Sequence, residues 1–112
     1  MMKAEDKRNA TKANNIMLEQ IKDMEKERQS REIASFLFSR CEKAIEKETT
    51  KYETYVEVER GWALKGFTRA EQDAIILRAV EMTRKMITEY GYDVTVITYT
   101  TIPPIARIFI SW

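Results

Sequence analysis

The chain has 112 residues, 44% of them hydrophobic and 33% charged, which suits one domain and leaves no room for separate substrate and cofactor domains. Its 19 basic and 18 acidic side chains leave a net charge of +1, so neither nucleic acid nor an anionic membrane is an expected partner. No apolar run approaches the ~20 residues of a membrane span, and the charged start of the chain does not resemble a secretory signal, so we expect a cytoplasmic protein.

Residues 3–48 contain no glycine or proline and are rich in strong helix formers, which predicts a long helix. The first half carries one narrow apolar stripe with a spacing of three or four residues, made by Ala13, Met17, Ile21 and Met24. Residues 25–32 contain no apolar side chain, and a second stripe starts out of phase at Ile33. Either one helix carries two contact surfaces, or Ser30 caps a second helix.

The first stripe is typical of a short helix–helix seam, although a strict heptad fails beyond Met24. We therefore predict that residues 1–31 form a charged helical extension that drives oligomerisation, and that residues 32–112 form an α+β domain. Two alternatives are that the stripe packs back on its own domain, or that its methionines accept a foreign helix.

Residues 52–59 alternate between apolar and polar side chains, which predicts a half-buried strand. Residues 60–67 follow as an irregular connection that contains two of the three glycines. Thr68 and Glu71 have the spacing of a capping box, with Phe67 placed as a hydrophobic staple, and Gly91 supplies the C-terminal stop of the helix between them.

The apolar surface of the helix 68–90 is wider than one sheet requires, so its second flank is expected to meet either the helix 33–45 or a second subunit. If that flank meets a second subunit, Met82 and Met86 belong to the predicted oligomer interface together with the first stripe.

Two further strands are predicted over 92–99 and 105–112, joined by a proline-bearing turn over 101–104. Trp112 is predicted to lie in or beside the core. The outer face of these strands, which is predicted to face away from the helix, is also partly apolar, so we expect another surface to cover it. Its apolar residues are Ile97, Tyr99, Ile105 and Phe109. The predicted fold class is α+β: one long N-terminal helix, or two helices, followed by a β-α-β-β module whose small three-stranded sheet packs on one long helix.

Two short motifs carry a resemblance. The run Gly91-Tyr92-Asp93-Val94 after a capped helix, and the run Ile110-Ser111-Trp112, resemble small uncharacterised proteins of tailed bacteriophages, which share the charged N-terminal helix. The segment 60–67 and the Pro103-Pro104 turn depart from that group. The resemblance implies a phage accessory protein, a class whose members commonly block or sequester host factors.

Enzyme signals are absent from the sequence. It contains no histidine, the commonest general base and metal ligand, and its single cysteine, Cys41, builds neither a disulfide nor a zinc site. The alternating Glu53, Glu57 and Glu59 fit a solvated strand face better than a pair of catalytic carboxylates. We therefore expect a non-enzymatic protein with no cofactor and no metal.

The strongest candidate for a binding site combines three cations and a large aromatic surface at the start of a helix, where backbone amides favour anions. Its residues are Arg60, Trp62, Lys65 and Arg69. The alternative is that Trp62 and Phe67 close the edge of the core while the cations are solvated. Tyr99 and Arg107, on the outer strand face, form a second candidate site.

The leading hypothesis is a homo-oligomeric binding protein that blocks a host protein or sequesters a small anionic, nucleotide-like ligand. A structural or assembly protein is the first alternative, and a weak nucleic-acid-binding module is the second.

Overall fold

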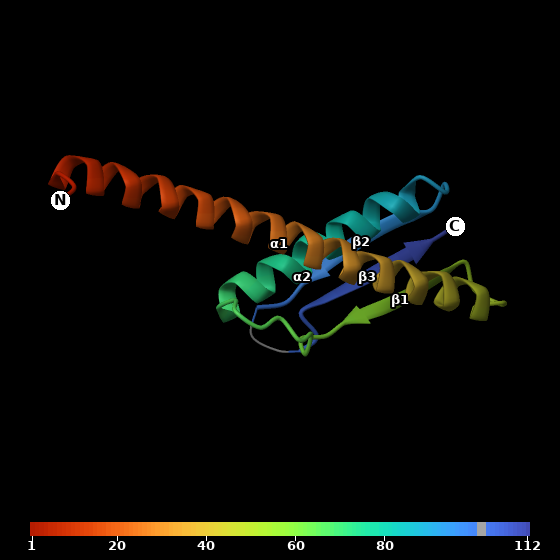
Figure 1. Ribbon diagram of the computed structural model, residues 1–112. Coiled ribbons are helices and arrows are strands. Elements are labelled where there is room, and N and C mark those ends of the chain that lie inside the picture. The colour runs from red at the N-terminus through yellow and green to blue at the C-terminus, as the bar shows by residue number, and fades with distance from the viewer. Residues whose placement is uncertain (101–102) are drawn as a thin grey trace.

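The computed structural model describes residues 1–100 and 103–112. Its elements, in chain order, are α1 (Ala4–Lys47), β1 (Glu53–Val58), α2 (Arg69–Thr88), β2 (Asp93–Thr98) and β3 (Ala106–Ser111) (Figure 1). The predicted α+β class is confirmed. The turn predicted over 101–104 lies partly outside the described residues.

The three strands form one sheet in the order β1-β3-β2, and β3 is antiparallel to both neighbours. The strands β1 and β2 therefore run parallel to each other, with β3 inserted between them. Ile108 on β3 is paired with Val56 on one side and Val96 on the other. This row faces the helices, and Ile108 is fully buried beneath them. Both helices lie on the same face of the sheet (Figure 1).

Helix α1 is continuous, so Ser30 does not cap a second helix. Ser30 is buried where α1 packs on α2, and its hydroxyl donates to the carbonyl oxygen of Ile75 at 3.1 Å. In the same interface the Thr83 hydroxyl lies 2.8 Å from the carbonyl oxygen of Ala79 and 3.3 Å from that of Ala34. Ser30 and Ala34 on α1 and Ala79 on α2 are small, and both hydroxyls have a hydrogen-bond acceptor within the chain.

The wide apolar surface of α2 is covered within the chain. One flank meets α1 and the other meets β2 and β3, which resolves the choice between the helix 33–45 and a second subunit in favour of the helix. The buried side chains that α1 contributes to this core are Ile33, Ala34, Leu37 and Cys41.

Two residues differ from their predicted positions. Ile105 was predicted to face away from the helices but is only 2% exposed. Its N–H donates to the Val58 carbonyl and its own carbonyl accepts from the Tyr99 N–H, both at 2.9 Å, so the chain is tied inward before β3 begins. Trp112 was predicted to lie in or beside the core but is 42% exposed. It follows the end of β3 and is held by one backbone bond to the Tyr52 carbonyl, which leaves its ring at the end of the sheet.

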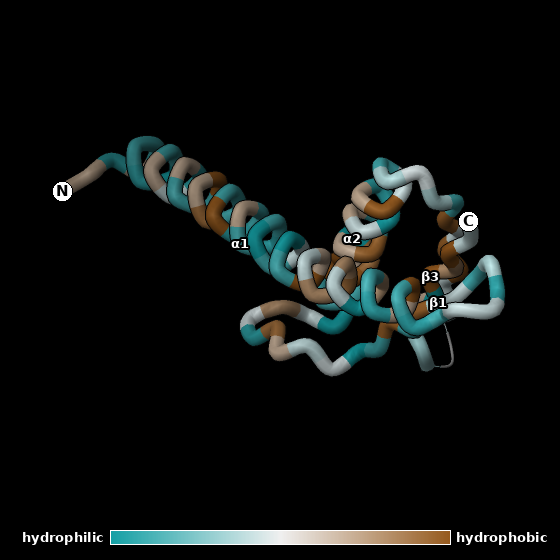
Figure 2. Tube along the Cα trace, turned by 90° about the vertical axis from the view of Figure 1, so that its right-hand side faces the viewer, coloured by the Kyte–Doolittle hydropathy of each residue, from teal (hydrophilic) through white to brown (hydrophobic). Residues whose placement is uncertain are grey.

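The N-terminal half of α1 projects from the domain (Figures 1 and 2). Residues 1–24 are all exposed, and the first buried residue of the helix is Ser30. The molecule measures 75 × 30 × 19 Å, and α1, whose 44 residues rise about 1.5 Å each, is about 66 Å long and sets the long dimension. Within the described residues, neither helix has an apolar stretch of the length and purity that crossing a bilayer demands.

Candidate ligand-binding site at the start of helix α2

The segment between β1 and α2 is fixed by local hydrogen bonds. Thr68 and Glu71 form the predicted capping box: the Thr68 hydroxyl accepts from the Glu71 N–H at 3.2 Å, and the Glu71 carboxylate accepts from the Thr68 N–H at 3.0 Å. Phe67 does not act as a hydrophobic staple, because the residue one turn into the helix is Gln72. The Gln72 amide instead donates to the carbonyls of Phe67 and Leu64, at 2.9 and 3.2 Å. This amide holds the connection against the first turn of α2.

Trp62 anchors the same connection to α1. Its ring meets Phe36 edge to face, with centroids 5.1 Å apart and planes at 84°, a favoured geometry for aromatic pairs. Both Trp62 and Phe67 are half-buried against the core. These contacts match the predicted alternative in which the two rings close the edge of the core, and they also give Trp62 a fixed orientation.

A hollow opens between this connection and the first turns of α2. It brings together three of the four predicted ligand-binding residues, Arg60, Trp62 and Arg69, and it is completed by Gly61, Gln72, Asp73 and Ile76. Lys65, the fourth, is exposed and lies outside the lining.

The charge in the hollow is less positive than the sequence suggested. Arg60 forms a two-point ion pair with Asp73, with bonds of 3.0 and 3.3 Å, and this pairing raises the pKa of the guanidinium. Arg69 has no ion pair among the described residues. An anion in the hollow would therefore meet one compensated cation, one uncompensated cation and the half-buried Trp62. Asp73 follows Arg69 by four positions, a spacing that places the two on one helix face. This spacing in the sequence could have indicated that the cluster includes a negative charge.

Comparison with protein-family models, with curated proteins and with solved structures finds no match.

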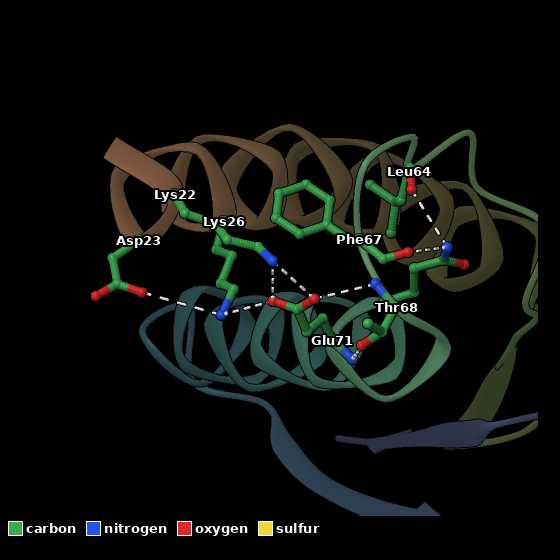
Figure 3. Close-up of polar contacts among 8 residues, drawn as sticks. Lys22, Asp23, Lys26, Leu64, Phe67, Thr68 and Glu71 are labelled. Atoms are coloured by element: carbon green, nitrogen blue, oxygen red, sulfur yellow. Dashed lines mark hydrogen bonds and ion pairs between the residues drawn. The ribbon is translucent and has the colours of Figure 1, made fainter. Parts of the chain in front are cut away.

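Beside the hollow, Glu71 joins α1 to α2 (Figure 3). Lys22 and Lys26 both reach its carboxylate, with N–O distances of 2.9 and 3.2 Å. The Lys22 ammonium also lies 5.7 Å from the centre of the Phe67 ring, within range of a cation–π contact. The pKa of Glu71 is lowered to about 2, first by the hydrogen bond from the Thr68 backbone and then by Lys22.

Sequence reasoning missed this cluster, because Lys22 and Glu71 are 49 residues apart. The two lysines are four positions apart and so share a helix face, but the sequence around them does not indicate which carboxylate they contact. Arg78 makes a similar bridge to Glu27 on α1, at 2.7 Å. These ion pairs fix α1 where it leaves the domain.

The second candidate site lies on the face of the sheet away from the helices. Arg107 is held there by an ion pair to Glu57 at 3.0 Å, and its guanidinium lies 5.5 Å from the Tyr99 ring centre and 5.9 Å from that of Tyr55. The centres of the Tyr55 and Phe109 rings lie 5.8 Å apart. The structure therefore brings Tyr99 and Arg107 together within an aromatic patch, and Tyr55 was not among the predicted site residues. Aromatic and arginine side chains are enriched in protein interfaces.

The predicted oligomer residues separate into two groups. Ala13, Met17, Ile21 and Met24 are exposed on the projecting half of α1, with Met24 exposed at 72%. Two further exposed apolar residues, Ile16 and Leu18, flank them. Met82 and Met86 are instead half-buried against the chain's own core, so the structure does not place them with the stripe.

Proposed function

We propose that this protein is a non-enzymatic, homo-oligomeric binding protein of the phage accessory or counter-defence type, which blocks a host protein or sequesters a small anionic, nucleotide-like ligand. The observation that carries the proposal is the exposed stripe on α1, which none of the described residues covers. The resemblance at residues 91–94 and 110–112 supports the phage assignment.

The direction of the stripe supports self-association. At about 100° per residue, Met17, Ile21 and Met24 fall within roughly 60° of one another around the helix. The same geometry places them roughly 150° away from the side that packs on the core. A second copy is therefore able to cover the stripe without displacing the domain. The side of α1 that faces α2 carries Lys22 and Lys26 instead, and both are already paired with Glu71.

Light scattering coupled to size-exclusion chromatography tests the assembly. At roughly tens of micromolar, where mass action favours association, we expect wild type to contain more than one subunit and the Met17→Glu/Ile21→Glu variant to be monomeric. The matched control is Thr11→Glu/Asn15→Glu, which adds the same charge to the same helix away from the stripe and should keep the wild-type mass. A monomeric wild type, or equal masses for wild type and the stripe variant, would contradict the proposal.

The hollow at the start of α2 supports an anionic ligand. The uncompensated Arg69 supplies charge, the half-buried Trp62 supplies a ring for base stacking, and the amino-terminal amides of α2 favour negative charge. The aromatic patch around Arg107 supports the other branch of the proposal, in which a host protein is blocked.

Titration with AMP and with inorganic phosphate tests the ligand. Trp62 fluorescence reports binding in a Trp112→Phe background, and AMP should bind more tightly than phosphate if the base stacks. Arg69→Glu should weaken binding strongly, Lys65→Glu should weaken it less, and the distant control Lys47→Glu should not change it. The weakening should shrink as salt rises, because exposed charges are screened over about 8–10 Å near physiological ionic strength.

Light scattering and the AMP and phosphate titrations, together with a titration of a short DNA or RNA, separate the alternatives. A structural or assembly protein would form the oligomer and bind neither AMP nor phosphate. A nucleic-acid-binding module would bind a short DNA or RNA with an affinity that falls steeply with salt.

A further inference from the structure

At the far end of α2, a second hollow opens between the carboxyl-terminal halves of the two helices. The helices diverge there (Figures 1 and 2), and the space between them has a volume of about 180 Å³. Buried Ile87 and half-buried Ile45 line it, so its surface is partly apolar. This hollow shares no residue with the one at Arg60.

Three aromatic rings also line this space: Phe38 from α1, and Tyr90 and Tyr92 from the turn that follows α2. Phe38 and Tyr90 lie 5.9 Å apart with their planes tilted by 39°. Trp112 meets Tyr92 edge to face at 6.0 Å and thereby orients it. Tyr90 is 72% exposed, so its ring is accessible to a ligand. Aromatic faces carry negative potential and attract cations.

The charged groups of this hollow are carboxylates. Glu42 and Glu46 lie one turn apart on the same side of α1, both exposed and neither in an ion pair among the described residues. Lys43 and Lys47 lie on the same stretch of helix, but at about 100° per residue they point more than about 100° away from the hollow. Of the basic residues in the last turns of α2, Arg84 is paired with Glu81, and Lys85 lies roughly 160° around the helix from Ile87, which lines the hollow.

The helix ends add to the same potential. The hollow is flanked by the last turns of α1, which ends at Lys47, and of α2, which ends at Thr88. The carboxyl-terminal end of a helix carries a partial negative charge that favours cations. Rings, carboxylates and helix ends therefore all select positive charge, and the apolar lining selects a ligand with a hydrocarbon body.

From this arrangement we infer that the hollow between the diverging ends of α1 and α2 binds an alkylated ammonium ligand. The cationic head lies against the rings of Phe38, Tyr90 and Tyr92, the carboxylates of Glu42 and Glu46 compensate its charge, and its methyl or methylene groups contact Ile45. An anion is repelled at this end of α2. The two ends of one helix thus carry sites of opposite preference.

The test uses choline and its neutral isostere 3,3-dimethylbutan-1-ol, followed by the amide shifts of residues 90–92 in nitrogen-15 spectra of the full chain. Choline should shift these amides in a saturable way, and the isostere should bind at least about fivefold more weakly, as expected from loss of the cation–π and charge contributions. Nα-acetyl-lysine methylamide, added in parallel, reports whether a lysine side chain of a partner protein fits as well as a free quaternary ammonium ligand.

Glu42→Gln/Glu46→Gln should weaken choline at least about fivefold by the same reasoning, and Tyr90→Leu should weaken it further. Both sites are exposed, so the variants should keep the wild-type circular dichroism. Glu5→Gln/Glu19→Gln, which removes the same charge from the projecting half of α1, is the control and should bind choline like wild type. Equal binding of choline and its isostere, unchanged binding by the double variant, or the absence of shifts at residues 90–92 would each overturn the inference.

Discussion

Replacing Leu37 by alanine should remove a large part of the stability of the domain. Leu37 is 0% exposed and belongs to the core between α1, α2 and the sheet. The substitution deletes the outer carbons of the side chain, each of which contributes about 0.8 kcal/mol of transfer free energy. With the added cost of the cavity, the loss should reach about 2–5 kcal/mol, against a total of about 5–15 kcal/mol for a domain.

Phe36 provides a control one residue away on the same helix. It is 52% exposed and contacts Trp62 through one edge-to-face pair, so Phe36→Ala should cost only about 1 kcal/mol. Urea unfolding at one protein concentration, followed by tryptophan fluorescence, measures both variants. If Leu37→Ala loses no more free energy of unfolding than Phe36→Ala, the placement of α1 on the core is wrong.

Three smaller predictions follow from single side chains. Burial raises the pKa of the Cys41 thiol to about 12, so iodoacetamide at pH 8 should label it only in urea; rapid labelling of the folded protein would contradict its burial. The pKa of Glu71 is lowered from its ordinary value of 4.5 to about 2, so its ion pairs stabilise the fold fully above pH 4.5 and lose this effect as the pH falls towards 2. Glu71→Gln should therefore lower the urea midpoint at pH 7, and the difference from the wild-type midpoint should narrow at pH 3. A difference that stays constant between pH 7 and pH 3 would refute the linkage. Deleting Trp112 should cost about 1 kcal/mol, because the exposed ring makes one aromatic edge contact; a loss above about 3 kcal/mol in urea unfolding would indicate a core residue instead.

Local signals in the sequence predicted the elements well. The capping box at Thr68 and Glu71 depends on residues three apart, and the stop at Gly91 depends on one positive φ angle, so both follow from the chain itself. The same holds for the second stripe of α1. The number of helices did not follow, because Ser30 suits both a cap and a close helix contact, and the choice is made by its bond to Ile75, 45 residues away.

The candidate sites show the same division. The sequence placed Arg60, Trp62 and Arg69 near one another because all lie within ten residues around one helix start. It did not show that Asp73 compensates Arg60, since this pairing depends on the path of the connection. The hollow at the other end of α2 was missed entirely, because Phe38 and Tyr90 are about fifty residues apart and meet only when the helices pack.

The central place of β3 has a consequence for protein synthesis. Translation completes β1 and β2 first, yet neither pairs with the other, because residues 106–111 separate them in the sheet. A nascent chain can form α1 from local hydrogen bonds, whereas every ladder of the sheet waits for β3 to leave the ribosome. The ladder between β1 and β3 joins residues about fifty positions apart, and contacts that distant in sequence form slowly. Until then the apolar faces of both edge strands remain open, so we expect chaperones to bind the nascent chain.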